Sequence, residues 1–211
     1  MRSLLFATLT LLSACAHAAD AKAQLVTFLD DLQGLAAEFS QRVMDERGNL
    51  LETSRGTLKV KRPGQFRWTY TEPYPQEIIG NKTRVWIYDS ELEQVSVKAM
   101  DETLGNSPAL LLSSDKPLEE AFEVESLGSH NMMDWVELKP LNDESSFASF
   151  RVGLADGTLR VMELHDNLGQ RTQLSFGNID RNPTLADSVF EFEPPPGADV
   201  VGDIPATEKT N

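Results

Sequence analysis

Short segments with alternating apolar and polar side chains follow one another along most of this chain, and they constrain its fold more than any other feature. Because side chains alternate between the two faces of a strand, each segment predicts a β-strand. The predicted strands cover residues 37–46, 50–61, 65–72, 76–80, 83–89, 92–99, 121–127, 133–140, 147–155, 158–165 and 170–178. Turn residues separate them at short, regular intervals, which predicts one antiparallel meander that forms a barrel or a strongly curved sheet.

Two segments have helical periodicity instead. Residues 20–37 place five apolar side chains on one side of a helix: Leu25, Phe28, Leu29, Leu32 and Leu35. Residues 105–115 place Leu110 and Leu111 shortly after Pro108, which predicts a short apolar helix. A closed sheet either fills its interior with side chains or holds a ligand there, so a helix across its mouth would act as a lid.

The predicted strand 65–72 carries Phe66, Trp68 and Tyr70 at every second position, so all three aromatic side chains point to one face. Such a face is ordinarily the core side of an antiparallel sheet, and the alternative is a face that binds a ligand. The pattern leaves both open. Residues 85–88, which include Trp86, are apolar on both faces, as expected for a strand that is covered on both sides.

The first 18 residues have the pattern of an export signal. Arg2 precedes an apolar run at residues 4–12, and residues 16–18 form an A-x-A cleavage site. Cleavage there would leave residues 19–211 as a single domain and would remove Cys15, the one cysteine of the chain. Residues 12–15 also resemble a bacterial lipobox; if that signal were used, Cys15 would be acylated and the protein anchored.

The composition and motifs exclude several classes of function. A formal net charge of −14, or −15 once Arg2 is removed, disfavours nucleic acids and anionic membrane surfaces as partners. His130 and His165 lack the spacing of a metal site, and no nucleophile motif is present. We therefore expect no metal, no cofactor and no enzymatic activity.

Several motifs occur in a specific order and at specific intervals. They are FSQRV at 39–43, RGTLKVKRPGQFRW at 55–68, PQEIIGNK at 75–82, VWIYDSELEQV at 85–95, GNSPALLL at 105–112 and FEFEPPPG at 190–197. Together they resemble the periplasmic outer-membrane lipoprotein carrier family, LolA, over nearly the whole mature chain. One departure is minor: residues 81–82 are Asn-Lys where the family usually has an Asp-Gly type of turn.

The resemblance implies a mainly β fold: an incomplete, strongly curved antiparallel β-barrel closed by a lid of α-helices. It implies a periplasmic chaperone that binds the acyl chains of lipoproteins released from the inner membrane and delivers them to an outer-membrane receptor. The implied partners are acylated lipoproteins as cargo, an inner-membrane lipoprotein-releasing ABC transporter and an outer-membrane receptor of the LolB type. We expect a monomer.

The family's arginine in its KRP motif falls on Arg62, which the resemblance implies to be a latch that holds the lid closed. The family's next phenylalanine, which matters for delivery and docking, falls on Phe66, and its tryptophan falls on Trp68. Pattern and resemblance together predict an acyl-chain cavity or rim made of Phe66, Trp68, Tyr70, Trp86, Leu110 and Leu111. Two alternatives stay open: an anchored lipoprotein acceptor or sensor of the same fold, and a solidly packed barrel with a structural or enzymatic role.

Overall fold

The computed structural model describes residues 20–100, 107–142 and 145–202. The predicted export signal at residues 1–18 and the possible acylation site at Cys15 lie outside the described residues.

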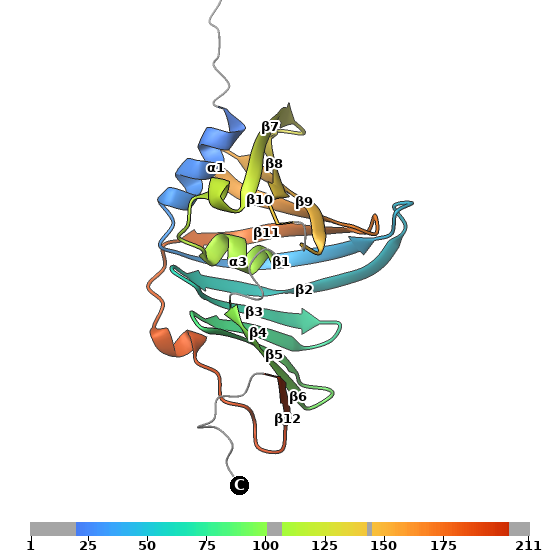
Figure 1. Ribbon diagram of the computed structural model, residues 1–211, viewed down its shortest axis with the longest axis vertical. Coiled ribbons are helices and arrows are strands. Elements are labelled where there is room, and N and C mark those ends of the chain that lie inside the picture. Colours follow the sequence, from blue (N-terminus) through green and yellow to red (C-terminus); the bar gives the residue numbers. More distant parts are fainter. Residues whose placement is uncertain (1–19, 101–106, 143–144, 203–211) are drawn as a thin grey trace, which may run out of the picture.

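In this part of the chain, twelve strands form a single sheet (Figure 1). The first six are β1 (Gly34–Met44), β2 (Leu50–Lys61), β3 (Gln65–Glu72), β4 (Gln76–Asn81), β5 (Arg84–Asp89) and β6 (Gln94–Ala99). The others are β7 (Phe122–His130), β8 (Met133–Pro140), β9 (Phe147–Ala155), β10 (Thr158–Asp166), β11 (Arg171–Arg181) and β12 (Asp199–Gly202). The predicted strands are therefore confirmed to within a few residues, and β12 is an addition to them.

The order of the strands is β12-β6-β5-β4-β3-β2-β1-β11-β10-β9-β8-β7. The sheet stays open because its two edge strands, β12 and β7, do not pair with each other. The expectation of one continuous meander is wrong in detail. Two meanders, β1–β6 and β7–β11, are joined by the antiparallel pair of β1 and β11. The expected incomplete, strongly curved sheet is confirmed (Figure 1).

The expectation of a wholly antiparallel sheet is also wrong at one edge. Strand β12 pairs with β6 in parallel, with Val200 opposite Val95. A parallel neighbour needs a long connection, and residues 182–198 supply it. They pass through the short 3₁₀ helix η2 (Asp187–Phe190) and the triple proline before β12 begins.

The helices α1 (Ala21–Asp30) and α3 (Pro108–Ser113) lie on the same face of the sheet (Figure 1). Both begin with a side-chain cap: the Asp20 carboxylate accepts from the Lys22 amide, and the Ser107 hydroxyl accepts from the Ala109 amide. A further 3₁₀ turn, η1 (Leu118–Glu120), leads into β7. Among the described residues, no helix has both the length and the apolar character that crossing a membrane requires.

The predicted helix at residues 20–37 is too long. Helix α1 ends at Asp30, and β1 begins at Gly34 after a three-residue link. Leu35 keeps the helical spacing but lies between two strands, opposite Val60 of β2 and Arg181 of β11. Hydrogen bonding to a neighbour on each side holds this segment as a strand, while Leu35 stays buried as its spacing predicted.

Candidate functional site: the inner face and its helical cover

The two faces of the sheet are covered by different parts of the chain. We call the face under α1 and α3 the inner face; its cluster of buried side chains includes Leu58, Phe66 and Val85. The opposite, outer face carries a smaller buried cluster that includes Ile79 and Trp86. The inner face is the larger apolar surface, and it is the one that movement of the helices would expose.

Phe66 and Trp68 point to the inner face, as the alternation on β3 predicted, and they are 1% and 3% exposed. Tyr70, the third aromatic residue of the strand, packs at the margin of the same cluster and is partly buried. The structure therefore brings these three predicted residues together on one surface.

Two glycines make room for the rings of this surface. Phe66 lies opposite Gly80 of β4, where an added Cβ would stand 2.2 Å from Cε1 of the ring. Phe39 of β1 lies opposite Gly56 of β2, where an added Cβ would stand 2.9 Å from the Phe39 ring. Each ring therefore lies close against the backbone of a neighbouring strand, and a larger residue at either glycine would collide with it; at Gly56 such a residue would also collide with the Thr69 carbonyl oxygen.

Phe39 reaches across Gly56 into an aromatic cluster built from β1, β3 and β11. Its ring centroid lies 4.7 Å from that of Trp68 and 5.2 Å from that of Tyr70. Phe176 of β11 packs against Trp68 at 6.5 Å in an edge-on arrangement. These separations are typical of favourable aromatic contacts, so the centre of the inner face is a continuous aromatic surface.

The hydroxyl of Tyr70 donates to the side-chain oxygen of Gln41 at 3.0 Å. Burial raises the pKa of Tyr70 to about 12, and the carboxylate of Glu52 acts in the same direction. The phenol therefore stays neutral at physiological pH. It gives the aromatic surface one polar margin without a charge.

Leucines from both helices cover the inner face. Leu110 and Leu111 of α3 belong to the same cluster as Phe66 and are 4% and 9% exposed. Helix α1 adds Leu25 and Leu29, which are 2% and 4% exposed. In this state, apolar side chains of the protein itself occupy the inner face.

The turn between β2 and β3 contacts both covering helices. The Arg62 guanidinium donates to the carbonyl oxygen of Leu29 and lies 3.5 Å from that of Leu32, at the carboxyl end of α1. The amide of Gly64 donates to the carbonyl oxygen of Ser113, the last residue of α3, at 2.8 Å. A cation at the carboxyl end of a helix is favourable because the free carbonyls there carry partial negative charge. One turn thus fastens both helices.

Burial lowers the pKa of the Arg62 guanidinium, while the carboxylates of Asp115 and Asp30 act in the opposite direction. An arginine nevertheless keeps its charge at any physiological pH. The contacts of Arg62 with α1 therefore do not depend on pH in the physiological range.

Trp86 does not join the other predicted cavity residues, and its placement on the inner face is wrong. The register Phe66–Gly80–Val85 puts Val85 on the inner face, so the next residue, Trp86, points outward. There it packs against Phe192 of the C-terminal segment, with 5.8 Å between ring centroids. Because residues 85–88 are apolar on both faces, the sequence could not assign a face to each of them.

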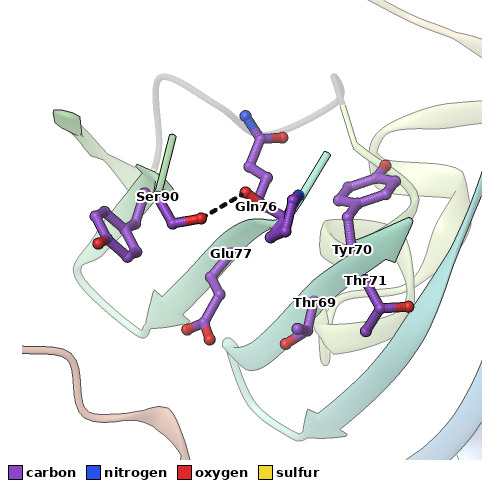
Figure 2. A pocket seen from close by; sticks show the side chains of 8 residues that line it. Thr69, Tyr70, Thr71, Gln76, Glu77 and Ser90 are labelled. Atoms are coloured by element: carbon purple, nitrogen blue, oxygen red, sulfur yellow. Dashed lines mark hydrogen bonds between the residues drawn. The ribbon is translucent and has the colours of Figure 1, made fainter. Parts of the chain in front are cut away.

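A pocket of about 300 Å³ opens where the ends of β3, β4 and β5 meet (Figure 2). Its lining is Thr69, Tyr70, Thr71, Pro75, Gln76, Glu77, Tyr88 and Ser90. The Ser90 hydroxyl donates to the Pro75 carbonyl oxygen at 3.2 Å across one side of it. Tyr70 lines this pocket from the margin of the inner face, whereas Thr69, Glu77 and Tyr88 point to the outer face, so the pocket lies at the ends of these strands rather than on the inner face.

The ionisable groups of the described residues do not assemble into a reactive centre. No group of three histidine, cysteine, aspartate or glutamate side chains there is placed to hold a metal ion. His165 lies on β10 with Nε2 3.7 Å from Glu163, and its burial, aided by Arg151, lowers its pKa.

Two kinds of residue at this surface were missed by sequence reasoning. Gly56 and Gly80 interrupt otherwise regular strands, and that interruption was the available signal for close approach of a ring. Asn182, after β11, binds the link between α1 and β1 through its side chain. No local pattern marks it, because its partners lie about 150 positions earlier in the chain.

Comparison with known proteins gives a consistent result. The model of the family described as outer membrane lipoprotein carrier protein LolA matches residues 30–193. An outer-membrane lipoprotein carrier protein from Dechloromonas aromatica is 44% identical over 198 residues, which cover 94% of this chain and 93% of the relative. The protein of the same name from Methylococcus capsulatus is 41% identical over 182 residues, covering 86% and 88% of the two chains.

Solved structures agree on the fold. A LolA superfamily protein from Nitrosomonas europaea superposes with a TM-score of 0.51 at 13% identity, covering 83% of this chain and 99% of the other. An uncharacterised conserved protein from Thermus thermophilus gives 0.56 at 12% identity, with 86% and 96% covered. These likenesses concern the fold alone. The family match and the two relatives, which each extend over most of the chain, show that the protein belongs to the outer-membrane lipoprotein carrier family, LolA.

Proposed function

We propose that this protein is a periplasmic chaperone that binds the acyl chains of lipoproteins and carries them between membranes without a catalytic step. The observation that carries this proposal is the inner face: a large aromatic and aliphatic surface that two short helices cover in the described part of the chain. The names of the relatives, outer-membrane lipoprotein carrier proteins, point to the same cargo.

The energetics suit a carrier that must also release its cargo. An acyl chain gains about 0.8 kcal/mol for each CH₂ group removed from water. To reach the inner face, however, it must displace leucines of α1 and α3 such as Leu29 and Leu110, which are buried there without cargo. The cost of displacing them offsets part of the gain. Binding therefore stays weak enough for a receptor with an already open surface to take the cargo.

The predicted residues have distinct parts in this proposal. Phe66, Trp68, Tyr70, Leu110 and Leu111 line the surface that receives the chains. Arg62 acts as the latch, because its contacts with α1 must break when that helix moves. Trp86 has no part in the cavity.

The partners follow from this role. An inner-membrane ABC transporter that releases lipoproteins would supply the cargo, and an outer-membrane lipoprotein receptor of the LolB type would receive it. We propose that the carrier works as a monomer in the periplasm, after removal of residues 1–18. A membrane-anchored acceptor is the second candidate, because residues 12–15 read Leu-Ser-Ala-Cys. The mass of the mature N-terminus distinguishes Ala19 from an acylated Cys15.

Native mass spectrometry of the protein purified from the periplasm tests the proposal directly. We expect a one-to-one complex with an acylated lipoprotein. The substitution Leu111→Lys should abolish it by placing a charge on the inner face. Leu168→Lys is the matched control, because Leu168 is 87% exposed on the turn between β10 and β11. A cargo-free protein that also fails to extract lipoproteins from inner-membrane vesicles would refute the carrier function.

A further inference from the structure

The link between α1 and β1 consists of residues 31–33. Strand β1 lies in the middle of the sheet, paired with β2 and β11 along its length. Any movement of α1 away from the inner face must therefore turn about these three residues. The bonds that hold the link decide how easily the helix can leave.

Asn182 binds this link on both sides of the turning point. Its side-chain oxygen accepts from the amides of Gln33 at 2.7 Å and Gly34 at 3.1 Å. Its side-chain amide donates to the carbonyl oxygen of Asp31 at 3.0 Å. Its backbone amide donates to the carbonyl oxygen of Gly34 at 2.9 Å. One residue thus joins the end of α1 to the beginning of β1.

The chemistry of asparagine fits this position in two ways. Its φ angle is 57°, in the left-handed region that asparagine and glycine tolerate better than other residues. Its planar amide also carries an acceptor and a donor side by side, so that it can bind two amides and a carbonyl at once. Aspartate would keep the acceptor and lose the donor.

The neighbouring side chain supports the same attachment. The Arg181 guanidinium lies 4.8 Å from the centre of the Phe28 ring on α1. From the other side, the amide of Arg62 donates to the carbonyl oxygen of Gln33 at 2.9 Å. The backbone of Gln33 is therefore held between the β2–β3 turn and the end of β11.

We propose that Asn182 is a hinge lock, a positioning residue that holds α1 against the inner face and whose bonds break when cargo enters. It acts at the link, whereas Arg62 acts mainly at the last turn of the helix. The part of this proposal that concerns cargo rests on the proposed carrier function; the part that concerns α1 does not. Because the lock stabilises only the closed state, weakening it shifts the population toward the open state that binds cargo.

The substitution Asn182→Gly removes the three side-chain bonds and keeps a residue that accepts a positive φ angle. Asn178→Gly is the matched control: Asn178 lies on β11, shortly before Asn182, with φ 47°, and its side chain binds Glu38 at 2.8 Å instead of the link. Hydrogen exchange of the cargo-free protein should become about tenfold faster in residues 21–32 of Asn182→Gly. Exchange in β1 and β2, and all exchange in Asn178→Gly, should match the wild type.

Binding of a fluorescent triacylated lipopeptide provides the second readout. The affinity of Asn182→Gly for the lipopeptide should rise by about the same factor as the exchange rate of its α1. Asn178→Gly should bind the lipopeptide with the affinity of the wild type. Unchanged exchange in α1 would overturn the hinge lock, and so would faster exchange with unchanged or weaker binding. If the wild type itself binds no lipopeptide, the proposed carrier function is wrong. The exchange experiment then still tests whether Asn182 holds α1 against the inner face.

Discussion

The ring of Phe66 lies across Gly80 of the neighbouring strand, so closely that an added Cβ would stand 2.2 Å from Cε1 and 2.6 Å from Cδ1. Phe66 is 1% exposed and lies beneath the covering helices, so the ring cannot turn aside without disturbing the inner face. The glycine is therefore part of the surface that we propose for acyl chains, although it contributes no side chain to it.

The substitution Gly80→Ala should destabilise the protein by about 1–3 kcal/mol, the usual cost of overpacking a core. Chemical denaturation monitored by circular dichroism measures this. Gly177→Ala on β11 is the control, because an added Cβ there meets nothing within 4 Å. Equal stability of Gly80→Ala and Gly177→Ala would contradict the close packing of Phe66 on Gly80.

The outer-face cluster yields a prediction about the C-terminal segment. Phe192 lies 5.8 Å from both Trp86 and Tyr88, ring centre to ring centre, and helps cover a tryptophan that is only 3% exposed. The substitution Phe192→Ala should cost about 2 kcal/mol and should let acrylamide quench one additional tryptophan. Phe192→Leu should keep most of the protection. If the quenching gained in Phe192→Ala survives the further substitution Trp86→Phe, the gain does not come from Trp86.

The ion pairs of Glu137 lead to a prediction about how the stability of the folded protein depends on pH. Its burial alone would raise its pKa, but the bond from Arg151 at 2.9 Å and the charge of Lys139 outweigh this, so the pKa is lowered. In acid, the unfolded chain therefore binds a proton before the folded protein does. The contribution of Glu137 to stability is present above its unfolded pKa of 4.5 and is lost as the pH falls through the lower folded value.

Denaturant midpoints between about pH 3 and 6 test this linkage. We expect Glu137→Gln to lower the midpoint at pH 6 and to reduce its decline in acid. The control is Glu123→Gln, on the exposed edge strand β7. If the denaturant midpoint of Glu137→Gln declines with falling pH as steeply as that of the wild type, other carboxylates account for the acid sensitivity.

The sequence predicted the strands well because a half-covered strand must alternate apolar and polar residues, as Phe66, Trp68 and Tyr70 do. It could not assign Trp86 to a face, since the face depends on register with β4 and not on local pattern. Strand β12 was not predicted because its four residues are too few to show an alternation of apolar and polar side chains. Its pairing with β6 depends on where the preceding connection leads.

The helical cover was predicted in outline from leucine spacing, and its attachments only in part. The resemblance pointed to Arg62 as a latch, and the contacts of Arg62 with Leu29 and Leu32 give that expectation a geometry. Asn182 had no such signal. Its bonds join segments distant in sequence, and an asparagine after a strand is ordinarily a turn residue.

The latch proposed for Arg62 gives the last prediction. Arg62→Leu removes the donor to the carbonyl oxygens of Leu29 and Leu32 but keeps an apolar side chain at a half-buried site. The fold should persist, and residues 21–32 should exchange hydrogen faster. Because the closed state that competes with cargo is weakened, a bound triacylated lipopeptide should be transferred to acceptor vesicles more slowly. Arg160→Leu is the control, an exposed arginine on β10. Since the Arg62 side chain acts mainly at the last turn of α1 and the Asn182 side chain acts at the link that follows it, the exchange effects of Arg62→Leu and Asn182→Gly should add in free energy in the double variant. If hydrogen exchange and lipopeptide transfer in Arg62→Leu match those in Arg160→Leu, Arg62 is not a latch. If residues 21–32 of the double variant exchange no faster than in either single variant, the contacts of Arg62 and Asn182 break together as one unit.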